Sequence, residues 1–128
     1  MSKKILVVGD NADMRERMQV EIRSLGLTLI SVGDGTAGIE AAKTHRPDLI
    51  VTDAVMPKMS GIEMTTRLRA LPQFTNIPVI ILTGKSSTVE DEAVRVGPTL
   101  VLIKPVQPTS VVAKINELLG SESEATQD

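Results

Sequence analysis

Five short apolar runs, each followed by a segment with signals of a helix, constrain the fold of this chain more than any other feature. The runs are rich in valine, isoleucine and leucine and do not alternate strictly with polar residues, which is typical of parallel strands covered on both faces. They span Ile5–Val8, Leu27–Val32, Leu49–Thr52, Val79–Leu82 and Thr99–Ile103. Strands that alternate with helices predict an α/β fold, in which helices cover both sides of one parallel sheet and each crossover is right-handed.

The segments between the runs carry their own evidence for helices. Ser60 followed by Glu63 predicts a capping box at the start of the third helix, and Thr88 followed by Asp91 predicts a similar start for the fourth. In the first helix, apolar residues recur at spacings of four and three, so they fall on one face. That face is formed by Met14, Met18, Ile22 and Leu25.

The last helix and the end of the chain differ in character. An apolar stripe predicts the helix, and Gly120 follows it where a C-terminal cap belongs. The stripe consists of Val111, Val112, Ile115, Leu118 and Leu119. After Gly120 the chain reads SESEATQD, whose only apolar residue is an alanine, so this stretch has little with which to pack. We therefore expect one domain over residues 1–120 and a polar tail, or the start of a linker, over residues 121–128.

The composition argues against nucleic acid as a direct partner. A chain of 128 residues has the length of a single domain with one substantial core. Phe74 is its only aromatic residue, so stacking platforms for bases are missing. The net charge is −2, the pI is near 5.4, and no basic cluster extends beyond Lys3 and Lys4. Such a surface does not match the negative charge of a phosphate backbone.

Other features of the sequence predict a soluble cytoplasmic domain. The chain has no cysteine, which excludes disulfides and thiolate metal sites and is compatible with a reducing compartment. The apolar run after MSKK is ILVVG, which is shorter than the core of about 7–15 residues in a signal peptide. No run approaches the roughly 20 apolar residues of a membrane span.

Polar residues that could carry chemistry follow the apolar runs directly. Asp10 comes after the first run and Asp53 after the third, while Thr83 follows the fourth and Lys104 the fifth. In an open parallel sheet, ligands bind outside the carboxyl ends of the strands, where the strand order reverses. We therefore expect two carboxylates, a hydroxyl and an amine to share one small polar crevice.

The stretches around these strand ends resemble one known family. The sequence is similar to the receiver domain of two-component response regulators over residues 3–119. The matching stretches are ILVVGDN, LIVTDAVMPKMSG, VIILTG and LVLIKP, in the family's order and at its approximate spacings. The resemblance implies a flavodoxin-like (βα)5 three-layer sandwich with strand order 2-1-3-4-5. It also implies a signalling module rather than an enzyme, present as a monomer or weak dimer. Such a module receives a phosphoryl group from a sensor histidine kinase or phosphotransfer protein. It then signals to a downstream effector protein or domain.

The resemblance implies a role for each residue at the strand ends. Asp53 would be the phosphoacceptor, which is a poor nucleophile toward an anionic phosphoryl group unless cations neutralise the charge. Asp10, Asp53 and the backbone carbonyl of Val55 would hold Mg²⁺, because hard cations prefer oxygen ligands. Lys104 would pair first with Asp53 and later with the phosphoryl oxygens. The hydroxyl of Thr83 would donate a hydrogen bond to a phosphoryl oxygen.

Two positions depart from the family pattern. Gly9 stands where a typical receiver has the first of two consecutive acids, so two side-chain carboxylates remain instead of three and we expect weaker binding of Mg²⁺. Val101, three residues before Lys104, replaces the usual tyrosine or phenylalanine. A valine cannot fill and vacate a ring-sized space, so we predict a muted or differently routed switch at the face formed by the fourth helix, the fifth strand and the fifth helix. The family also has a cis peptide before the proline, here Pro105.

Each assignment has a plainer alternative. Asp10 could complement the dipole of the following helix, and we interpret His45 as a dipole partner at the end of the second helix rather than as a phosphotransfer residue. Met56 and Met59 are expected to pack the loop after the third strand. At the level of function, the alternative is a receiver-like interaction module that works without phosphorylation. An aspartyl-nucleophile hydrolase would need a second general acid, which DAVMP lacks, and a flavin or corrinoid carrier would need a ligand motif around the histidine.

Overall fold

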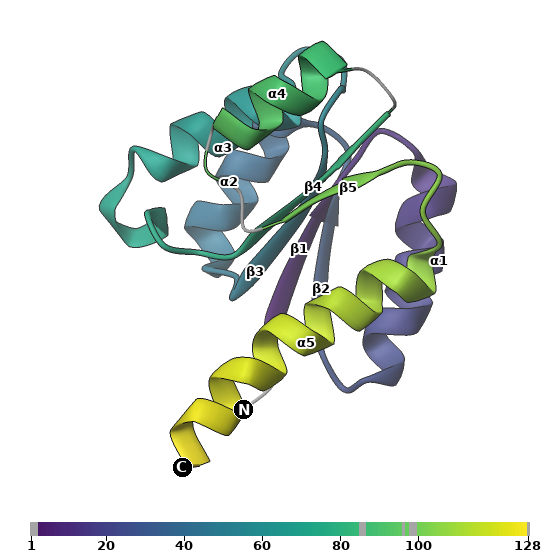
Figure 1. Cartoon of the computed structure of the whole chain (residues 1–128), viewed down its shortest axis with the longest axis vertical. Coiled ribbons are helices and arrows are strands. Elements are labelled where there is room, and N and C mark those ends of the chain that lie inside the picture. Colours follow the sequence, from purple (N-terminus) through teal and green to yellow (C-terminus); the bar gives the residue numbers. More distant parts are fainter. Residues whose placement is uncertain (1–2, 85–86, 96, 98–99, 128) are drawn as a thin grey trace.

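The computed structural model describes residues 3–84, 87–95, 97 and 100–127. Within these ranges, strands and helices alternate along the chain, with one short 3-10 helix at Pro72–Phe74 (Figure 1). The strands are β1 (Lys4–Val8), β2 (Thr28–Val32), β3 (Leu49–Asp53), β4 (Val79–Thr83) and β5 (Leu100–Ile103). The helices are α1 (Ala12–Ser24), α2 (Gly35–His45), α3 (Gly61–Arg69), α4 (Ser87–Arg95) and α5 (Pro108–Gln127).

The strands form one parallel sheet in the order β2-β1-β3-β4-β5, which confirms the predicted fold class and strand order. β1 lies in the interior of the sheet, where Ile5 is registered with Leu29 of β2 and with Leu49 of β3. The chain runs from β1 outward to β2 and then returns to the other side of β1 as β3. The winding therefore reverses between β1 and β3, and a ligand crevice is expected at their carboxyl ends.

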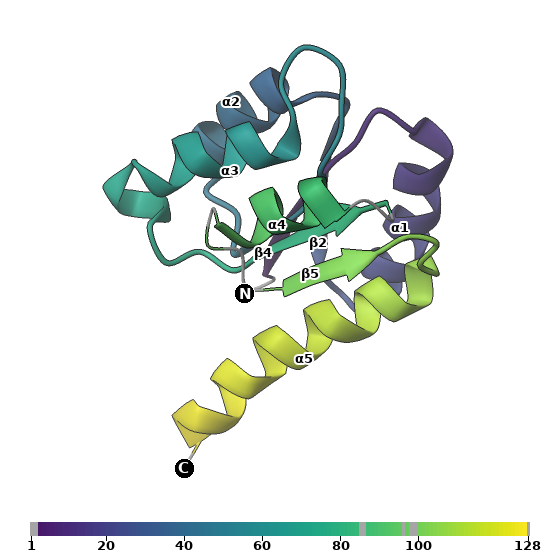
Figure 2. The ribbon, with the colours of Figure 1, turned by 45° about the horizontal axis from the view of Figure 1, so that its top comes forward.

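Helices cover both faces of the sheet and produce three layers (Figure 2). On the face covered by α1 and α5, Ile5 and Val7 belong to one core cluster with Ile115. On the face covered by α2, α3 and α4, Leu6 and Val8 belong to a second cluster with Met64. Successive residues of β1 are thus buried on opposite faces, which explains why its apolar run does not alternate with polar residues.

Side-chain caps fix the starts of three helices. Asn11 caps α1 and Asp34 caps α2, each by accepting a hydrogen bond from the backbone N–H three residues further on. Ser60 caps α3, because its hydroxyl accepts from the Glu63 N–H at 3.0 Å, which confirms the predicted start. α4 begins one residue before Thr88, whose side chain lies outside the described residues, so the cap predicted there stays a prediction.

Two predictions about helix ends are wrong. Leu25, predicted to lie on one face of the first helix with Met18 and Ile22, is instead the C-cap of α1 and is 46% exposed. Gly120, predicted as a C-terminal cap, lies inside α5, which continues to Gln127 as the yellow end of the ribbon (Figure 1). The residues after Gly120 include good helix formers and no proline, and residues 121–127 of the stretch predicted as a polar tail are helical. The domain boundary after residue 120 stays a prediction, and Thr99, the predicted start of the last strand, lies outside the described residues.

Candidate functional site

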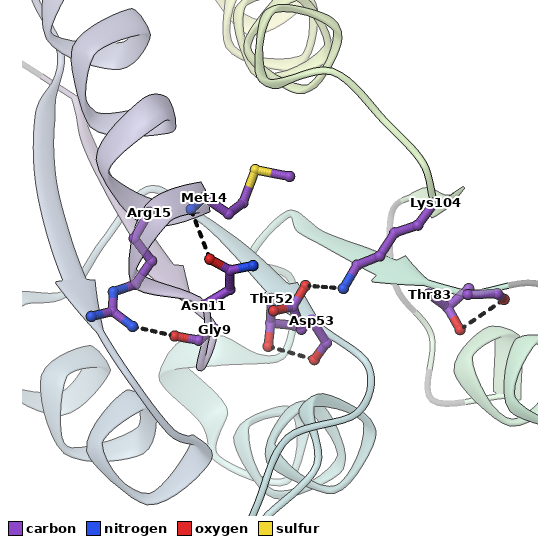
Figure 3. Close-up of polar contacts among 9 residues, drawn as sticks. Gly9, Asn11, Met14, Arg15, Thr52, Asp53, Thr83 and Lys104 are labelled. Atoms are coloured by element: carbon purple, nitrogen blue, oxygen red, sulfur yellow. Dashed lines mark hydrogen bonds and ion pairs between the residues drawn. The ribbon is translucent and has the colours of Figure 1, made fainter.

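Asp53 and Lys104 meet at the carboxyl edge of the sheet (Figure 3). Asp53 is the last residue of β3 and is only 6% exposed. The Lys104 Nζ lies 2.8 Å from Asp53 Oδ1, and the lysine side chain is 42% exposed. Burial of an ionised carboxylate is costly unless the charge is paired. The lysine provides that pairing and still faces solvent on its other side.

The main chain around Lys104 directs this side chain. The Lys104 N–H donates to the Thr83 carbonyl at 2.7 Å, directly after β5 ends. The peptide bond between Lys104 and Pro105 is cis, as predicted. β4 lies between β3 and β5, so the lysine reaches Asp53 across the end of β4.

Asp10 lies in the short connection between β1 and α1, at the same edge of the sheet. Asn11, not Asp10, provides the oxygen that caps α1. Asp10 is exposed, and among the residues that the structure describes its carboxylate has no hydrogen-bond or ion-pair partner. This carboxylate is therefore available to a ligand that enters from solvent.

Thr83 ends β4 at this edge, but its hydroxyl is turned away from Asp53 (Figure 3). The residue is 1% exposed, and its Oγ1 donates to the Gly84 carbonyl over 3.4 Å. A bond of that length is weak. A donor held so weakly can turn toward a stronger acceptor that enters the crevice.

The loop after β3, which carries Val55, is fixed at its two ends. The Ala54 N–H donates to a carbonyl of β4 at 2.8 Å, and the Ala54 carbonyl accepts from the Gly61 N–H at 2.9 Å. A β-carbon at Gly61 would lie 1.9 Å from the Asp53 carbonyl oxygen, so a glycine is needed for α3 to start this close to β3. This role of Gly61 was not predicted from the sequence. Its position directly after the capping Ser60 was the available signal.

Gly9, directly after β1, lies against the carboxylate of Asp53. A β-carbon at Gly9 would lie 2.6 Å from Asp53 Oδ2. The Gly9 carbonyl accepts a hydrogen bond from the guanidinium of Arg15 in α1 (Figure 3). The contact of Arg15 was not predicted from the sequence either. A cation near the start of a helix, where the helix dipole disfavours positive charge, was the available signal.

The predicted donor set suits a hard divalent cation. In the part of the chain that the structure describes, no group of three or more histidine, cysteine or acidic side chains is placed to hold a metal ion. The predicted ligands are the carboxylates of Asp10 and Asp53 and the backbone carbonyl of Val55, all of them oxygen donors. Proteins commonly hold Mg²⁺ through one or two carboxylates, with water and substrate oxygens as the other ligands. The three predicted ligands therefore fit magnesium, although the site has less negative charge than one with three acids would have.

The other residues singled out from the sequence lie in the core or at the opposite edge. Val101 is half-buried and packs against the core cluster beneath α2, α3 and α4. Met56 and Met59 pack in the same cluster, which confirms their predicted role. His45 is the last residue of α2, and its carbonyl accepts a hydrogen bond from the Lys4 ammonium near the start of β1. The histidine therefore lies at the edge of the sheet opposite to Asp53.

Comparison with known proteins identifies the family. The model of the response regulator receiver domain matches residues 5–116. Hybrid signal transduction histidine kinase D of Dictyostelium discoideum is 39% identical over 120 residues, which are 90% of this chain and 7% of that protein. The DNA-binding response regulator MtrA of Mycobacterium tuberculosis (strain ATCC 25618 / H37Rv) is 33% identical over 120 residues, which are 93% of this chain and 51% of that protein.

The fold is also similar to solved structures. The receiver domain of a sensor histidine kinase from Pseudomonas aeruginosa PAO1, with a magnesium ion coordinated in its active-site cleft, has a TM-score of 0.84 and 26% identity. The match covers 94% of this chain and 99% of that one. The chain spans about half the length of MtrA and a small fraction of the hybrid kinase, so the similarity concerns one domain of those proteins. The chain belongs to the response regulator receiver domain family of two-component signal transduction.

Proposed function

We propose that this receiver domain accepts a phosphoryl group on Asp53 from a histidine kinase or a phosphotransfer protein. The observation that carries the proposal is the buried Asp53 carboxylate, paired with Lys104 at 2.8 Å at the point where the winding of the sheet reverses. A nucleophile in that place is reachable from solvent and has a cation beside it. Asp10, whose carboxylate has no partner among the described residues, adds a second acid at this edge that could hold a metal ion for phosphoryl transfer.

The transfer exchanges one bond for another. A carboxylate oxygen of Asp53 forms a bond to phosphorus while the bond from phosphorus to the donor's histidine nitrogen breaks, and that nitrogen keeps the electron pair. The Lys104 ammonium moves from the carboxylate to the phosphoryl oxygens, because the phosphoryl group carries more negative charge than the carboxylate. The Thr83 hydroxyl leaves its 3.4 Å bond to Gly84 and donates to a phosphoryl oxygen.

Magnesium is the proposed cofactor. Asp10, Asp53 and the Val55 carbonyl would hold it, and a bound Mg²⁺ supplies positive charge to the phosphoryl oxygens. The related receiver from Pseudomonas aeruginosa has a magnesium ion in its cleft. Because Gly9 contributes no carboxylate, we expect this chain to need more Mg²⁺ than receivers with both acids, since affinity for hard cations rises with the charge of the ligands.

The phosphorylated domain is proposed to signal through altered contacts with a downstream effector protein or domain. We expect no direct contact with nucleic acid by the domain itself, although MtrA is named a DNA-binding regulator. No helix in the described part of the chain is long and apolar enough to cross a membrane. The second candidate, an interaction module independent of phosphorylation, is favoured by Val101, which is half-buried where the family has a mobile aromatic ring.

Intact mass measurement separates the two candidates. We expect wild type, incubated with Mg²⁺ and a small acyl phosphate, to gain one phosphoryl group that Asp53→Asn does not gain. Asp48→Asn is the matched control, because this acid lies at the opposite edge of the sheet and should be labelled like wild type. Wild type that stays unlabelled at saturating Mg²⁺ would favour the interaction module, and labelling of Asp53→Asn would place the acceptor elsewhere.

A further inference from the structure

The two oxygens of the Asp53 carboxylate have different surroundings. Oδ1 lies 2.8 Å from the Lys104 ammonium. Oδ2 points toward the end of β1, where it fills the space that a side chain at residue 9 would enter. A β-carbon at Gly9 would lie 2.6 Å from Oδ2 and 3.4 Å from Cγ of Asp53, whereas ordinary van der Waals contact begins at 3.4 Å. The carboxylate thus lies directly against the glycine.

The main chain of Gly9 cannot easily retreat from this contact. Its N–H donates to the Val32 carbonyl of β2 at 3.1 Å, and its carbonyl accepts from the guanidinium of Arg15. Both polar groups of the residue are therefore bonded, and β1 is an interior strand of the sheet. Movement of Gly9 would break one of these bonds or shift two neighbouring elements.

The main chain of Asp53 is fixed as well. The next residue, Ala54, donates its N–H to the Leu82 carbonyl at 2.8 Å. On the other side, α3 starts so close that a β-carbon at Gly61 would lie 1.9 Å from the Asp53 carbonyl. With both main chains held, only the carboxylate of Asp53 is free to move when residue 9 gains a β-carbon.

We propose that Gly9 is a positioning residue, and that the missing β-carbon at residue 9 sets the orientation in which the Asp53 carboxylate faces Lys104. A β-carbon at residue 9 moves Oδ2 by about 0.8 Å to reach ordinary contact. Because the two oxygens belong to one rigid group, that movement also displaces Oδ1 from the lysine. An acid at residue 9 therefore adds a metal ligand and turns the nucleophile at the same time.

The consequence for phosphoryl transfer rests on the function proposed above. A displacement of 1 Å in a reacting group can cost about 100-fold in rate, so a shift somewhat below that is expected to cost on the order of tenfold. Alanine at residue 9 brings the β-carbon without a carboxylate. The variant Gly9→Ala thus isolates the orientation of Asp53 from the supply of metal ligands, and comparison with Gly9→Asp measures the second effect.

The first experiment needs neither metal nor phosphodonor. The ¹³C chemical shift of Asp53 Cγ is measured in metal-free wild type, Gly9→Ala, Gly9→Asp and Gly33→Ala. Gly33 follows β2 as Gly9 follows β1, and among the described residues a β-carbon there would meet only the Arg15 guanidinium, at an ordinary contact distance of 3.5 Å, so Gly33→Ala is the matched control. We expect the Asp53 resonance to move in both Gly9 variants and to stay at the wild-type position in Gly33→Ala. An unchanged resonance in Gly9→Ala would overturn the proposal, even if wild type accepts no phosphoryl group.

Phosphorylation and stability give two further measurements. At saturating Mg²⁺, Gly9→Ala should form acyl phosphate about tenfold more slowly than wild type, whereas a residue that matters only as a missing ligand would leave the rate unchanged. In the wild-type background, Gly9→Ala should lower the urea midpoint. In the Asp53→Ala background, where the carboxylate beside Gly9 is gone, Gly9→Ala should leave the urea midpoint unchanged. Equal losses in the two backgrounds would mean that the β-carbon meets something other than the Asp53 carboxylate, and the proposal would be wrong.

Discussion

At the amino edge of the sheet, where the strands begin, charged side chains are bonded to the main chain around them. The Lys4 N–H donates to Asp48 Oδ2 at 2.8 Å, and the Lys4 ammonium donates to the His45 carbonyl at 3.1 Å. These bonds tie the start of β1 to the segment that leads into β3. At the carboxyl edge, by contrast, Lys104 is paired with Oδ1 of Asp53 and keeps nearly half of its side chain exposed.

Arg69 is the fullest example of the amino-edge pattern. Its Nη1 donates to the carbonyls of Phe74, Thr75 and Ile77 at 3.0, 3.2 and 2.6 Å. Its Nε and Nη2 donate to the Gly97 carbonyl at 3.3 and 3.0 Å. Burial lowers the pKa of the Arg69 guanidinium from its ordinary value. One side chain thus joins the end of α3, the segment before β4 and the segment before β5.

The difference between the edges indicates how a small domain separates stability from activity. The donors of Arg69 are bonded to neutral carbonyls, so this cation holds the fold together and has little capacity for a ligand. At the carboxyl edge, Asp10 has no partner among the described residues and the Thr83 hydroxyl has only a long bond. A ligand site needs polar groups that can form new bonds. Such groups lie at the carboxyl edge, where the ends of the strands meet the starts of the helices.

Replacement of Lys104 by methionine is the strongest test of this contrast, with the largest expected effect. We expect Lys104→Met to form acyl phosphate about 100-fold more slowly than wild type, the usual cost of removing one group that stabilises the transition state. Lys104 lies on the solvent side of the pair and is 42% exposed, so water can take the place of the ammonium at Asp53, and the free energy of unfolding should change by about 1 kcal/mol or less. Rates at saturating Mg²⁺ and urea denaturation measure the two quantities.

The opposite result would break the contrast between the edges. A loss of more than about 2 kcal/mol in stability, together with a wild-type rate, would make Lys104 a structural cation of the same kind as Arg69. The charge-retaining variant Lys104→Arg is the control for the size and shape of the cation. It should keep the pairing with Asp53 but recover the rate only in part, because a guanidinium is not a compact point charge.

Replacement of Arg69 by leucine should show the reverse pattern. We expect Arg69→Leu to lower the free energy of unfolding by about 2 kcal/mol. The partly buried carbonyls of Phe74 and Ile77 lose a charged donor, whereas the exposed carbonyls of Thr75 and Gly97 can bond to water instead. The rate of acyl phosphate formation should stay at the wild-type value. Arg67→Gln is the matched control on the same helix: its ion pair with Glu63 is exposed, so its loss should cost about 0.5 kcal/mol or less. Equal urea midpoints for the two variants would contradict the role given to Arg69.

The sequence predicted the features of both edges that depend on local pattern. The run Leu49–Thr52 located β3 because a strand buried on both faces must be apolar throughout, and Ser60 located the start of α3 because a helix start needs a capping oxygen. The contacts of Arg69 were not predictable, since they depend on how three loops meet in space. The collision between a β-carbon at Gly9 and Asp53 depends in the same way on the spacing of two strands that are far apart in the sequence.

Some misses had a different cause, which is that a local signal was outweighed by its neighbours. Gly120 is a plausible cap on its own, but the residues on both sides favour helix and the helix continues. Leu25 fits the apolar spacing of the first helix, but the helix ends before it and Gly26 follows with a φ of 78°. Single-residue signals were therefore weaker guides than the repeated pattern of strand ends, which brought Asp53 and Lys104 to the same edge.

The smallest effect is expected for Asp48, the acid of the amino edge. Asp48→Ala removes the acceptor of the Lys4 N–H and should lower the free energy of unfolding by about 1 kcal/mol, the ordinary net value of a hydrogen bond. Glu117→Gln is the control, because its 3.4 Å contact with Lys114 is exposed and should contribute little. Urea denaturation measures both variants, and hydrogen exchange at the Lys4 amide should speed up only in Asp48→Ala. Unchanged exchange there would mean that the bond contributes nothing, and the amino edge would then depend on Arg69 far more than on its acids.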